Sequence, residues 1–336
     1  MGGSDDSPGT EVAALRRIAI IGAGAMGVSL AALTSSHIPT VLVIRNPQRA
    51  AQVREYGVRM EGRLQAEGRP EVAPDIDALA EIHPIDLVVI ATKTTAIPEV
   101  CAAMRPHLRE LPFLLSYQNG IEPAHTIMKM LGTPRVVRMV LNYGAALVDD
   151  EDGPWRVEVA LHQPPHYIGG EGEESFAFAG ALAPVLSAMG FPTKFVEDLD
   201  VPVWQKGVLN GASNPVAALV QAPLGELLAS PAEPLIERLL DEGIAVAQAS
   251  GIELGVDYRE EMLALMRSGP THVPSMAEDV IRGRATEITQ LNVQIAEHGR
   301  QVGVPTPTHD AVIALIETID WRLGRTVSID RGMALP

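Results

Sequence analysis

The amino-acid sequence predicts an α/β protein in two parts, a mostly parallel sheet covered by helices and then an all-α C-terminal domain. Three observations support this prediction. The chain has 336 residues, enough for two domains. Hydrophobic residues make up 46% of it, which is typical of a folded globular protein. Short β-branched runs alternate with helical segments from Arg17 onward, whereas helical patterning alone follows Asp198.

The elements of the first domain, placed at residues 17–197, follow from its apolar runs. A helix is expected to open at Gly24, and strands are expected at Ile18–Ile21, Thr40–Ile44, Asp86–Ala91, Phe113–Ser116 and Val136–Leu141. Between Gly144 and Val196, segments with Gly and Pro suggest a hairpin, followed by a helix and a final strand. Residues 1–16 are expected to be a disordered lead-in, because their acidic, small start is unlike a secretory signal.

The second domain, residues 198–336, is predicted to be helical and to supply the substrate-binding and catalytic residues. Leu235–Glu242 and Ala311–Leu323 are examples of its helical patterning. Its hydrophobic helices make a homodimer plausible.

Charge and composition exclude several classes of function. The formal net charge is −16 and no long Lys/Arg block is present, so nucleic-acid and anionic-membrane partners are not expected. No apolar stretch approaches the roughly 20 residues that cross a bilayer. The single cysteine, Cys101, cannot form an internal disulfide and is expected to be buried. His162, His166 and His309 show no metal-ligand spacing, so we predict no metal. The lack of a membrane-spanning stretch and the single cysteine predict a soluble, cytoplasmic protein.

A glycine pattern follows the first strand directly. Ile18–Ile21 leads into G-x-G-x-x-G, made of Gly22, Ala23, Gly24, Ala25, Met26 and Gly27, and an apolar helix follows. This context indicates a Rossmann-type dinucleotide-binding domain, in which Gly22 permits the turn, Gly24 lets a pyrophosphate approach the backbone and Gly27 lets the helix pack on the strand. The helix N-terminus would face the phosphates. The alternative is a turn that merely needs small residues.

The end of the second predicted strand indicates which dinucleotide is bound. Arg45 stands where an acidic residue would hold the ribose 2′-hydroxyl of NAD. A guanidinium can instead bind a 2′-phosphate through parallel charge-assisted hydrogen bonds, so the predicted cofactor is NADP(H). The alternative is a solvated surface arginine beside Pro47.

Polar residues recur at helical spacing in the second domain. Lys206, Asn210 and Asn214 lie four residues apart, so they share one face of a helix. Asn has poor helix propensity, so two of them among apolar neighbours favour a stripe that faces a ligand. Pro274–Ile288 is expected to form a second polar helix that lines the same cleft.

With these motifs the chain resembles the ketopantoate reductase (2-dehydropantoate 2-reductase) family over nearly its whole length from Arg17. Five features match the family in order: the glycine pattern at Gly22–Gly27, Lys93 after a strand, the pair Asn119-Gly120, the K-x-x-x-N-x-x-x-N-P signature of Lys206, Asn210, Asn214 and Pro215, and the S-M…R-x-T-E stretch of Ser275-Met276 and Arg284–Glu287.

The resemblance implies an NADPH-dependent oxidoreductase of pantothenate biosynthesis that reduces a 2-oxo acid, with 2-dehydropantoate as the expected substrate. Hydride would pass from nicotinamide C4 to the ketone carbon while Lys206 supplies a proton to the carbonyl oxygen. Glu287 would orient Lys206. The other implied contacts are Asn210, Asn214 and Ser275 with the substrate, Asn119 where nicotinamide and substrate meet, and Lys93 beside the cofactor.

Each of these residues also has a structural interpretation. Lysines on helices usually face water, and Glu287 would pair with Arg284 if both lay on one helix, one turn apart. Ser275-Met276-Ala277-Glu278 is also an S-x-x-E capping box. Asn119-Gly120 is a common turn pair, and Lys93 is a charge at a strand end.

One departure from the family concerns the substrate. Three residues before the matched serine, where the family commonly has asparagine, this chain has His272. An imidazole is bulkier and can become cationic. A reductase of another 2-oxo acid, or of an imine in specialised metabolism, therefore remains an alternative, as does a catalytically silent NADPH-sensing protein.

Overall fold

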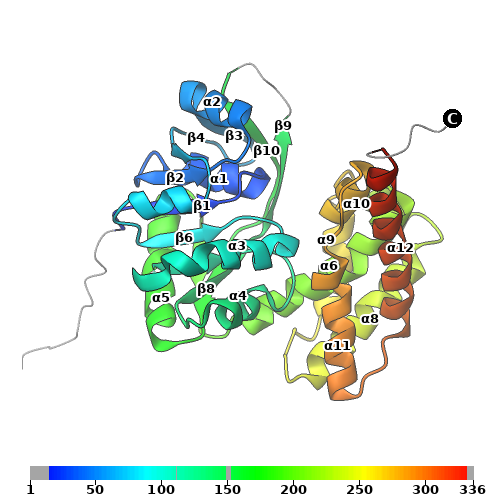
Figure 1. Ribbon diagram of the computed structural model, residues 1–336. Helices are drawn as coiled ribbons and strands as arrows, with labels where there is room; N and C mark the ends of the chain where they lie inside the picture. Colours follow the sequence, from blue (N-terminus) through cyan, green and yellow to red (C-terminus); the bar gives the residue numbers. More distant parts are fainter. Residues whose placement is uncertain (1–14, 111, 149–152, 331–336) are drawn as a thin grey trace, which may run out of the picture. The chain divides into compact units, whose positions relative to one another are not determined.

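The computed structural model describes residues 15–110, 112–148 and 153–330 (Figure 1). The chain divides into two compact units, each made of three separate segments of the sequence. The first unit contains the residues up to Ala91, with Ala102–Ser116 and Gly132–Glu197, and the second contains Thr92–Cys101, Tyr117–Leu131 and the residues from Asp198 onward. Two short segments that the sequence assigned to the first domain, 92–101 and 117–131, are thus grouped with the helical unit.

The first unit is built on a large sheet, as predicted. Its order is β12-β11-β8-β7-β6-β1-β2-β5. The strands are β1 (Ile18–Ile21), β2 (Thr40–Val43), β5 (Glu71–Ala73), β6 (Leu87–Ile90), β7 (Phe113–Ser116), β8 (Val136–Val140), β11 (His166–Gly170) and β12 (Thr193–Phe195). Only the pairing of β8 with β11 is antiparallel among the pairs of this sheet. Strands β1, β2 and β6 are buried at every residue, as in a parallel sheet covered on both faces.

A smaller sheet of the same unit contains the predicted hairpin. Its order is β4-β3-β10-β9, with β3 (Val58–Gly62), β4 (Ala66–Gly68), β9 (Tyr143–Val148) and β10 (Trp155–His162). Strands β9 and β10 pair antiparallel. The helical segments of this unit are α1 (Ala25–Thr34), α2 (Pro47–Tyr56), η1 (Asp77–Glu81), η3 (Arg105–Glu110) and α5 (Glu173–Ala188), and α5 with β12 are the predicted helix and final strand.

Most of the predicted lead-in, residues 1–14, lies outside the described residues. Arg16, near its end, pairs with Asp86 just before β6, with 2.6 Å between Nη2 and Oδ1.

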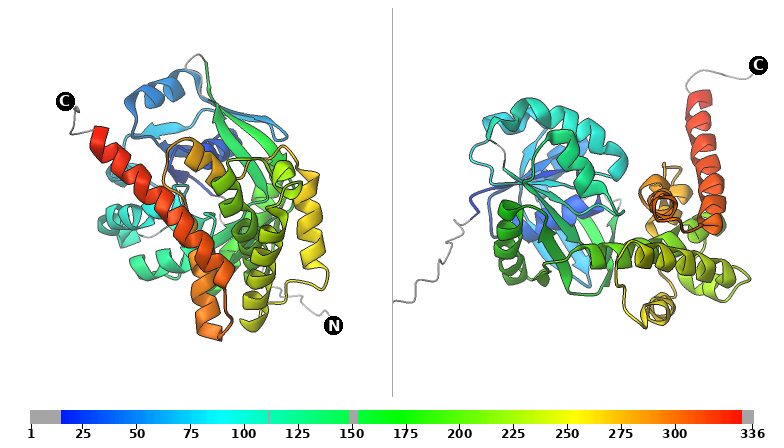
Figure 2. Two further views of the ribbon diagram at one scale, coloured as in Figure 1. Left: turned by 90° about the vertical axis from the view of Figure 1, so that its right-hand side faces the viewer. Right: turned by 90° about the horizontal axis from the view of Figure 1, so that it is seen from below.

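The second unit is helical, which confirms the predicted all-α region. Its helices are η2 (Thr94–Ala96), α4 (Pro123–Leu131), α6 (Asp200–Val220), α7 (Leu224–Leu228), α8 (Glu233–Ala249), α9 (Tyr258–Ser268), α10 (Ser275–Ile281), η4 (Ile288–Gln290), α11 (Asn292–Val302) and α12 (Pro307–Asp330), whereas α3 (Ile97–Met104) begins in this unit and ends in the first. Figure 2 shows α12 as a long helix along one side of this unit. A buried cluster joins α6, α10, η4 and α12 through Ala218, Met276, Ile288, Leu291 and Ile316.

The second polar helix predicted over Pro274–Ile288 is wrong in its length. Helix α10 ends at Ile281, and Gly283 takes φ +64°, a left-handed conformation that suits glycine and ends a helix. Residues 284–287 then form a loop that leads into η4. The capping box is wrong as well, because Pro274 is the N-cap and Ser275 is the first, exposed residue of the helix.

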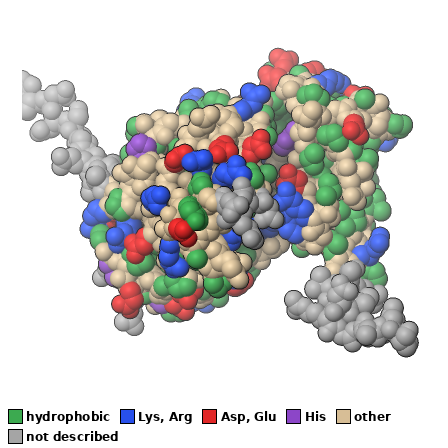
Figure 3. Space-filling view, turned by 90° about the horizontal axis from the view of Figure 1, so that it is seen from above, with side chains coloured by type: hydrophobic (Ala, Val, Ile, Leu, Met, Phe, Trp, Pro, Cys, Tyr) green, Lys and Arg blue, Asp and Glu red, His purple; other side chains and the backbone are tan. Residues whose placement is uncertain are grey.

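On the face drawn in Figure 3, acidic and basic side chains are interspersed. Among the residues that the structure describes, no helix has both the length and the apolarity that a membrane span requires.

Candidate active site

The glycine pattern forms a strand–turn–helix in the first unit. Gly22 has φ +112°, which makes the turn available to glycine, and α1 begins at Ala25 with Gly24 as its N-cap. A Cβ on Gly27 would lie 1.8 Å from the Gly22 carbonyl oxygen, so packing itself requires glycine there. A Cβ on Gly24 would meet no atom within 4 Å. Open space therefore lies over the backbone at the start of α1, where a pyrophosphate would need it.

Arg45 lies between the end of β2 and the start of α2. Its side chain is exposed, and Asn46, the next residue, caps α2 by accepting the Arg49 N–H at 3.0 Å. The exposed side chain of Arg45 is thus accessible from solvent. Ala23, Ala25 and Met26 are half-buried in the preceding turn and helix.

The predicted polar stripe lies on α6 of the second unit. Lys206 and Asn210 are half-buried and Asn214 is 4% exposed, and their spacing puts them on one face of this helix. Gly207 and Gly211 serve the packing of α6: a Cβ on Gly211 would lie 2.7 Å from Ile295 Cδ1.

Pro215 interrupts the hydrogen bonding of α6 just beyond the stripe. It has no N–H, so the carbonyl of Gly211 lacks its usual helical donor. The Nδ2 of Asn292 donates to that carbonyl at 2.7 Å instead, and also lies 3.0 Å from Nδ1 of His309. The other ring nitrogen, Nε2, is 3.0 Å from the carbonyl oxygen of Leu239, which can only accept, so we place the ring proton on Nε2.

These contacts fit a neutral His309, and they identify Asn292 as a residue that no sequence motif had indicated. Burial lowers the pKa of His309 and favours its neutral form. Asn292 supplies the missing hydrogen bond to helix α6, which carries Lys206. The proline at position 215 within a helical pattern could have indicated that such a donor is needed.

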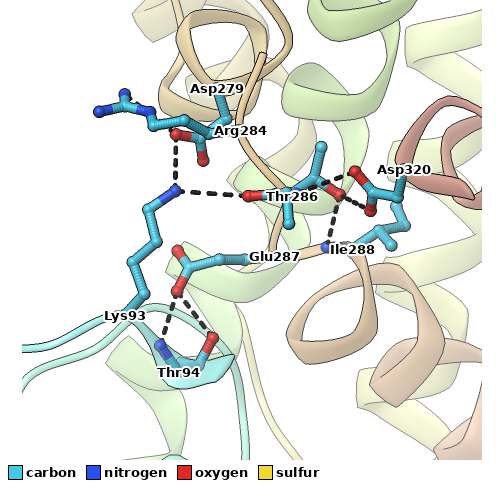
Figure 4. Close-up of polar contacts among 9 residues, drawn as sticks. Lys93, Thr94, Asp279, Arg284, Thr286, Glu287, Ile288 and Asp320 are labelled. Atoms are coloured by element: carbon cyan, nitrogen blue, oxygen red, sulfur yellow. Dashed lines mark hydrogen bonds and ion pairs between the residues drawn. The ribbon is translucent and has the colours of Figure 1, made fainter. Parts of the chain in front are cut away.

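Lys93 forms part of a charged cluster in the second unit (Figure 4). Its Nζ lies 2.6 Å from Oδ1 of Asp279 and donates to the carbonyl oxygen of Ala285 at 3.4 Å. Arg284 also reaches Oδ1 of Asp279, at 3.1 Å. Asp279 is only 5% exposed, so the carboxylate holds two cations with little solvent around it. No motif of the sequence pointed to Asp279.

Glu287 is held by the residue that follows Lys93. Its Oε1 accepts the Thr94 backbone N–H at 2.9 Å and the Thr94 hydroxyl at 2.7 Å. The alternative in which Glu287 pairs with Arg284 across one helical turn is wrong, because residues 284–287 are not helical and Arg284 pairs with Asp279. The expected contact between Glu287 and Lys206 stays a prediction.

Asn119-Gly120 forms a tight turn. Gly120 has φ +107°, and a Cβ there would lie 2.4 Å from the carbonyl oxygen of Gln290, so the turn requires glycine. Asn119 itself is half-buried. Just beyond it, Gln294 Oε1 accepts the N–H groups of Ile121 and Glu122 at 2.7 and 3.1 Å.

Glu122, after this turn, is flanked by two histidines. Hydrogen bonds from His125 and from His298 lower the pKa of the Glu122 carboxyl. The distances are 3.2 Å to His125 Nδ1 and 3.1 Å to His298 Nε2.

His272 and Ser275 lie before and at the start of α10. Burial lowers the pKa of His272, so its imidazole is favoured as neutral near pH 7, and its carbonyl accepts the Leu224 N–H at 3.0 Å. Cys101 is buried, as predicted. Within the described part of the chain, no group of three His, Cys, Asp or Glu residues is arranged to hold a metal ion.

Family models and known proteins match almost the whole chain. The family described as "Ketopantoate reductase PanE/ApbA" matches residues 18–169, and its C-terminal counterpart matches residues 198–320. A 2-dehydropantoate 2-reductase of Aquifex aeolicus is 27% identical over 307 residues, 89% of this chain and 95% of the relative.

Two solved structures share the fold. A PanE/ApbA family ketopantoate reductase from Ralstonia eutropha has a TM-score of 0.79 and 26% identity, and the match covers 92% of this chain and 99% of that one. A D-mandelate dehydrogenase, solved with NADH and anilino(oxo)acetate, has a TM-score of 0.78 at 24% identity, with the same coverage.

Proposed function

Since the chain belongs to the ketopantoate reductase family, we propose that it reduces 2-dehydropantoate to pantoate with NADPH. The family makes the chain an oxidoreductase that acts on a C=O or CH–OH group with a nicotinamide dinucleotide. The observation that supports the specific reaction best is the stripe on α6, where a half-buried lysine shares a helix face with two asparagines.

The cofactor is proposed to bind at the glycine turn and at Arg45, which follows the next strand. Two further contacts are proposed from the family motifs. Bound NADPH would supply the hydride for the ketone carbon. Residues 22–27 offer backbone N–H groups and open space at Gly24 to the pyrophosphate. Arg45 is proposed to bind the 2′-phosphate, which NADH lacks. Lys93 and Asn119 are proposed to contact the cofactor.

Lys206 is proposed as the proton donor. As the ketone carbon gains the hydride, the electron pair of the C=O bond moves to oxygen, which takes a proton from Lys206 Nζ, and Lys206 recovers one from solvent. An ammonium aimed at this oxygen stabilises the developing charge most where water is partly excluded, as at a half-buried position. Glu287 is proposed to orient this ammonium.

Asn210, Asn214 and Ser275 are proposed to bind the carboxylate and hydroxyl groups of the substrate, with Asn119 beside them. A second candidate is a reductase of another 2-oxo acid or of an imine, and His272 favours it, since the family commonly has an asparagine there. The neutral imidazole favoured by burial adds bulk rather than charge, which would change the acyl group accepted more than the carboxylate.

The test follows NADPH absorbance with purified protein and 2-dehydropantoate. Pyruvate and an aromatic 2-oxo acid serve as comparison substrates, NADH as comparison cofactor, and Lys206→Ala as the control enzyme. We expect fast oxidation of NADPH by 2-dehydropantoate and a loss of about 10²- to 10⁴-fold in kcat for Lys206→Ala. Preference for another 2-oxo acid would favour the second candidate, and tight NADPH binding without any turnover would favour a silent NADPH-sensing protein.

We propose that residues 17–197 form the cofactor domain and that residues 198–336 form the substrate domain. The homodimer and the cytoplasmic location are proposals too, to be checked by light scattering of the purified protein and by cell fractionation.

A further inference from the structure

The carboxylate of Glu287 has a defined partner in Thr94, far from it in sequence. Both bonds from Thr94, at 2.9 Å from the backbone N–H and 2.7 Å from the hydroxyl, end on the same oxygen, Oε1. Thr94 is 3% exposed, so water competes little for these bonds. Figure 4 shows the other carboxylate oxygen pointing away from Thr94.

Two donors on one oxygen restrict how the carboxylate can turn. The backbone N–H cannot move without moving the chain, and the hydroxyl sits on a β-branched side chain with few rotamers. Hydrogen bonds to a carboxylate are stronger than those between neutral groups. Glu287 is therefore held with one oxygen occupied and its second oxygen free of Thr94.

Both partners are themselves held in place. Lys93, the residue before Thr94, forms the 2.6 Å ion pair with buried Asp279. On the other side, Thr286 precedes Glu287, and its backbone N–H and hydroxyl donate to the two carboxylate oxygens of Asp320 on α12, at 3.0 and 2.7 Å. The contact between Thr94 and Glu287 thus lies between two other fixed contacts (Figure 4).

We propose that Thr94 is the positioning residue of Glu287: its hydroxyl and N–H hold Oε1 so that the second oxygen is aimed at Lys206. This inference rests on the proposed function, in which Glu287 orients the proton donor. Thr94 touches neither substrate nor cofactor in this role and acts through Glu287 alone.

The test compares three substitutions in η2. Thr94→Val keeps the shape and removes the hydroxyl, Thr94→Ser keeps the hydroxyl, and Thr95→Val changes the exposed neighbour on the same turn. We expect Thr94→Val to lower kcat about ten-fold or more, with the KM for NADPH within two-fold of wild type. Thr94→Ser should recover most of the loss, and Thr95→Val should match wild type.

Two kinetic outcomes would overturn the proposal. One is wild-type kcat in Thr94→Val, and the other is an equal loss in Thr94→Ser and Thr94→Val, which would indicate packing rather than the hydroxyl. If Thr94→Val fails to fold, Thr94→Ala takes its place in the same comparison.

A second readout does not depend on turnover. In a double-mutant cycle of Thr94→Val and Glu287→Gln, urea unfolding should give a coupling of at least about five-fold in the unfolding equilibrium constant. If the wild type reduces no 2-oxo acid, the proposed function fails, and this cycle alone then decides whether Thr94 holds Glu287. Additive effects would overturn the positioning role.

Discussion

Glycines of the same motif serve different purposes at the residue scale. Gly27 is required by packing, because its Cβ would meet the Gly22 carbonyl oxygen at 1.8 Å, whereas no atom lies within 4 Å of a Cβ on Gly24. A turn that merely needs small residues explains Gly22 and Gly27 but gives no reason for glycine at position 24. A ligand that approaches the backbone supplies that reason.

This difference predicts that alanine at position 24 affects NADPH binding, whereas alanine at position 27 affects stability. Gly24→Ala should leave the free energy of unfolding within about 0.5 kcal/mol of wild type and weaken NADPH binding. Gly27→Ala should destabilise the protein by about 1–3 kcal/mol, because α1 must move off β1. Urea unfolding and fluorescence titration with NADPH measure the two effects. Unchanged NADPH affinity in a well-folded Gly24→Ala protein would contradict the cofactor assignment.

At the scale of elements, helix α6 depends on a partner from α11. Pro215 leaves the Gly211 carbonyl without a helical donor, and Asn292 supplies one at 2.7 Å. An unpaired buried carbonyl costs about 1–3 kcal/mol. Helix α6 carries the polar stripe, so the same contact supports the proposed proton donor.

We therefore predict that Asn292→Leu destabilises the protein by about 1–3 kcal/mol and that Pro215→Ala partly reverses the loss. The backbone N–H restored by Pro215→Ala can donate to Gly211. Urea unfolding of wild type, both single variants and the double variant forms the required cycle. If Asn292→Leu lowers the free energy of unfolding equally with and without Pro215→Ala, the carbonyl of Gly211 is not the group that matters.

The contact of α12 with α8 and α11 through His309 predicts a pH dependence of stability. Burial lowers the folded-state pKa of His309 below the unfolded value of about 6.5. The unfolded chain therefore binds more protons as the pH falls below that value, so this stability is present above about pH 6.5 and lost below it. The Glu122 carboxyl, whose folded pKa is also lowered, loses its contribution only at more acidic pH, below about 4.5.

Below pH 6.5, His309 should lower the free energy of unfolding by at most about 1.4 kcal/mol per pH unit. Urea unfolding at pH 7.5 and 5.5 measures it, and His309→Gln should be less stable at pH 7.5 yet show a smaller difference between the two pH values. Identical differences for wild type and variant would rule out His309 as a cause.

At the scale of the whole molecule, the choice of cofactor should appear as a change in global stability. A ligand that binds only the folded state at 100 times its Kd stabilises that state by about 2.7 kcal/mol. NADPH should thus raise the Tm more than NADH at equal concentration. Arg45→Ala should remove most of this difference, whereas Arg54→Ala, in the last turn of helix α2 that follows Arg45, should keep it.

Thermal unfolding with each cofactor provides the measurement. An NADH effect equal to that of NADPH in the wild type would contradict the assignment of the 2′-phosphate to Arg45.

Local patterns determined much of this protein. Apolar runs predicted strands β1, β2, β6, β7 and β8, and the glycine pattern predicted the turn and the start of α1, because these features depend on neighbouring residues in the chain. The spacing of Lys206, Asn210 and Asn214 predicted their shared helix face for the same reason.

Tertiary structure decided the partners of the site residues. Thr94 and Glu287, Lys93 and Asp279, and Gly211 and Asn292 are each far apart in sequence, and only packing brings them together. The end of α10 at Ile281 belongs to this class too, since the polar pattern of 274–288 resembles a helix while Gly283 adopts a left-handed conformation. A sequence pattern encodes what lies within a few residues, whereas a hydrogen bond across the fold depends on where every intervening element packs.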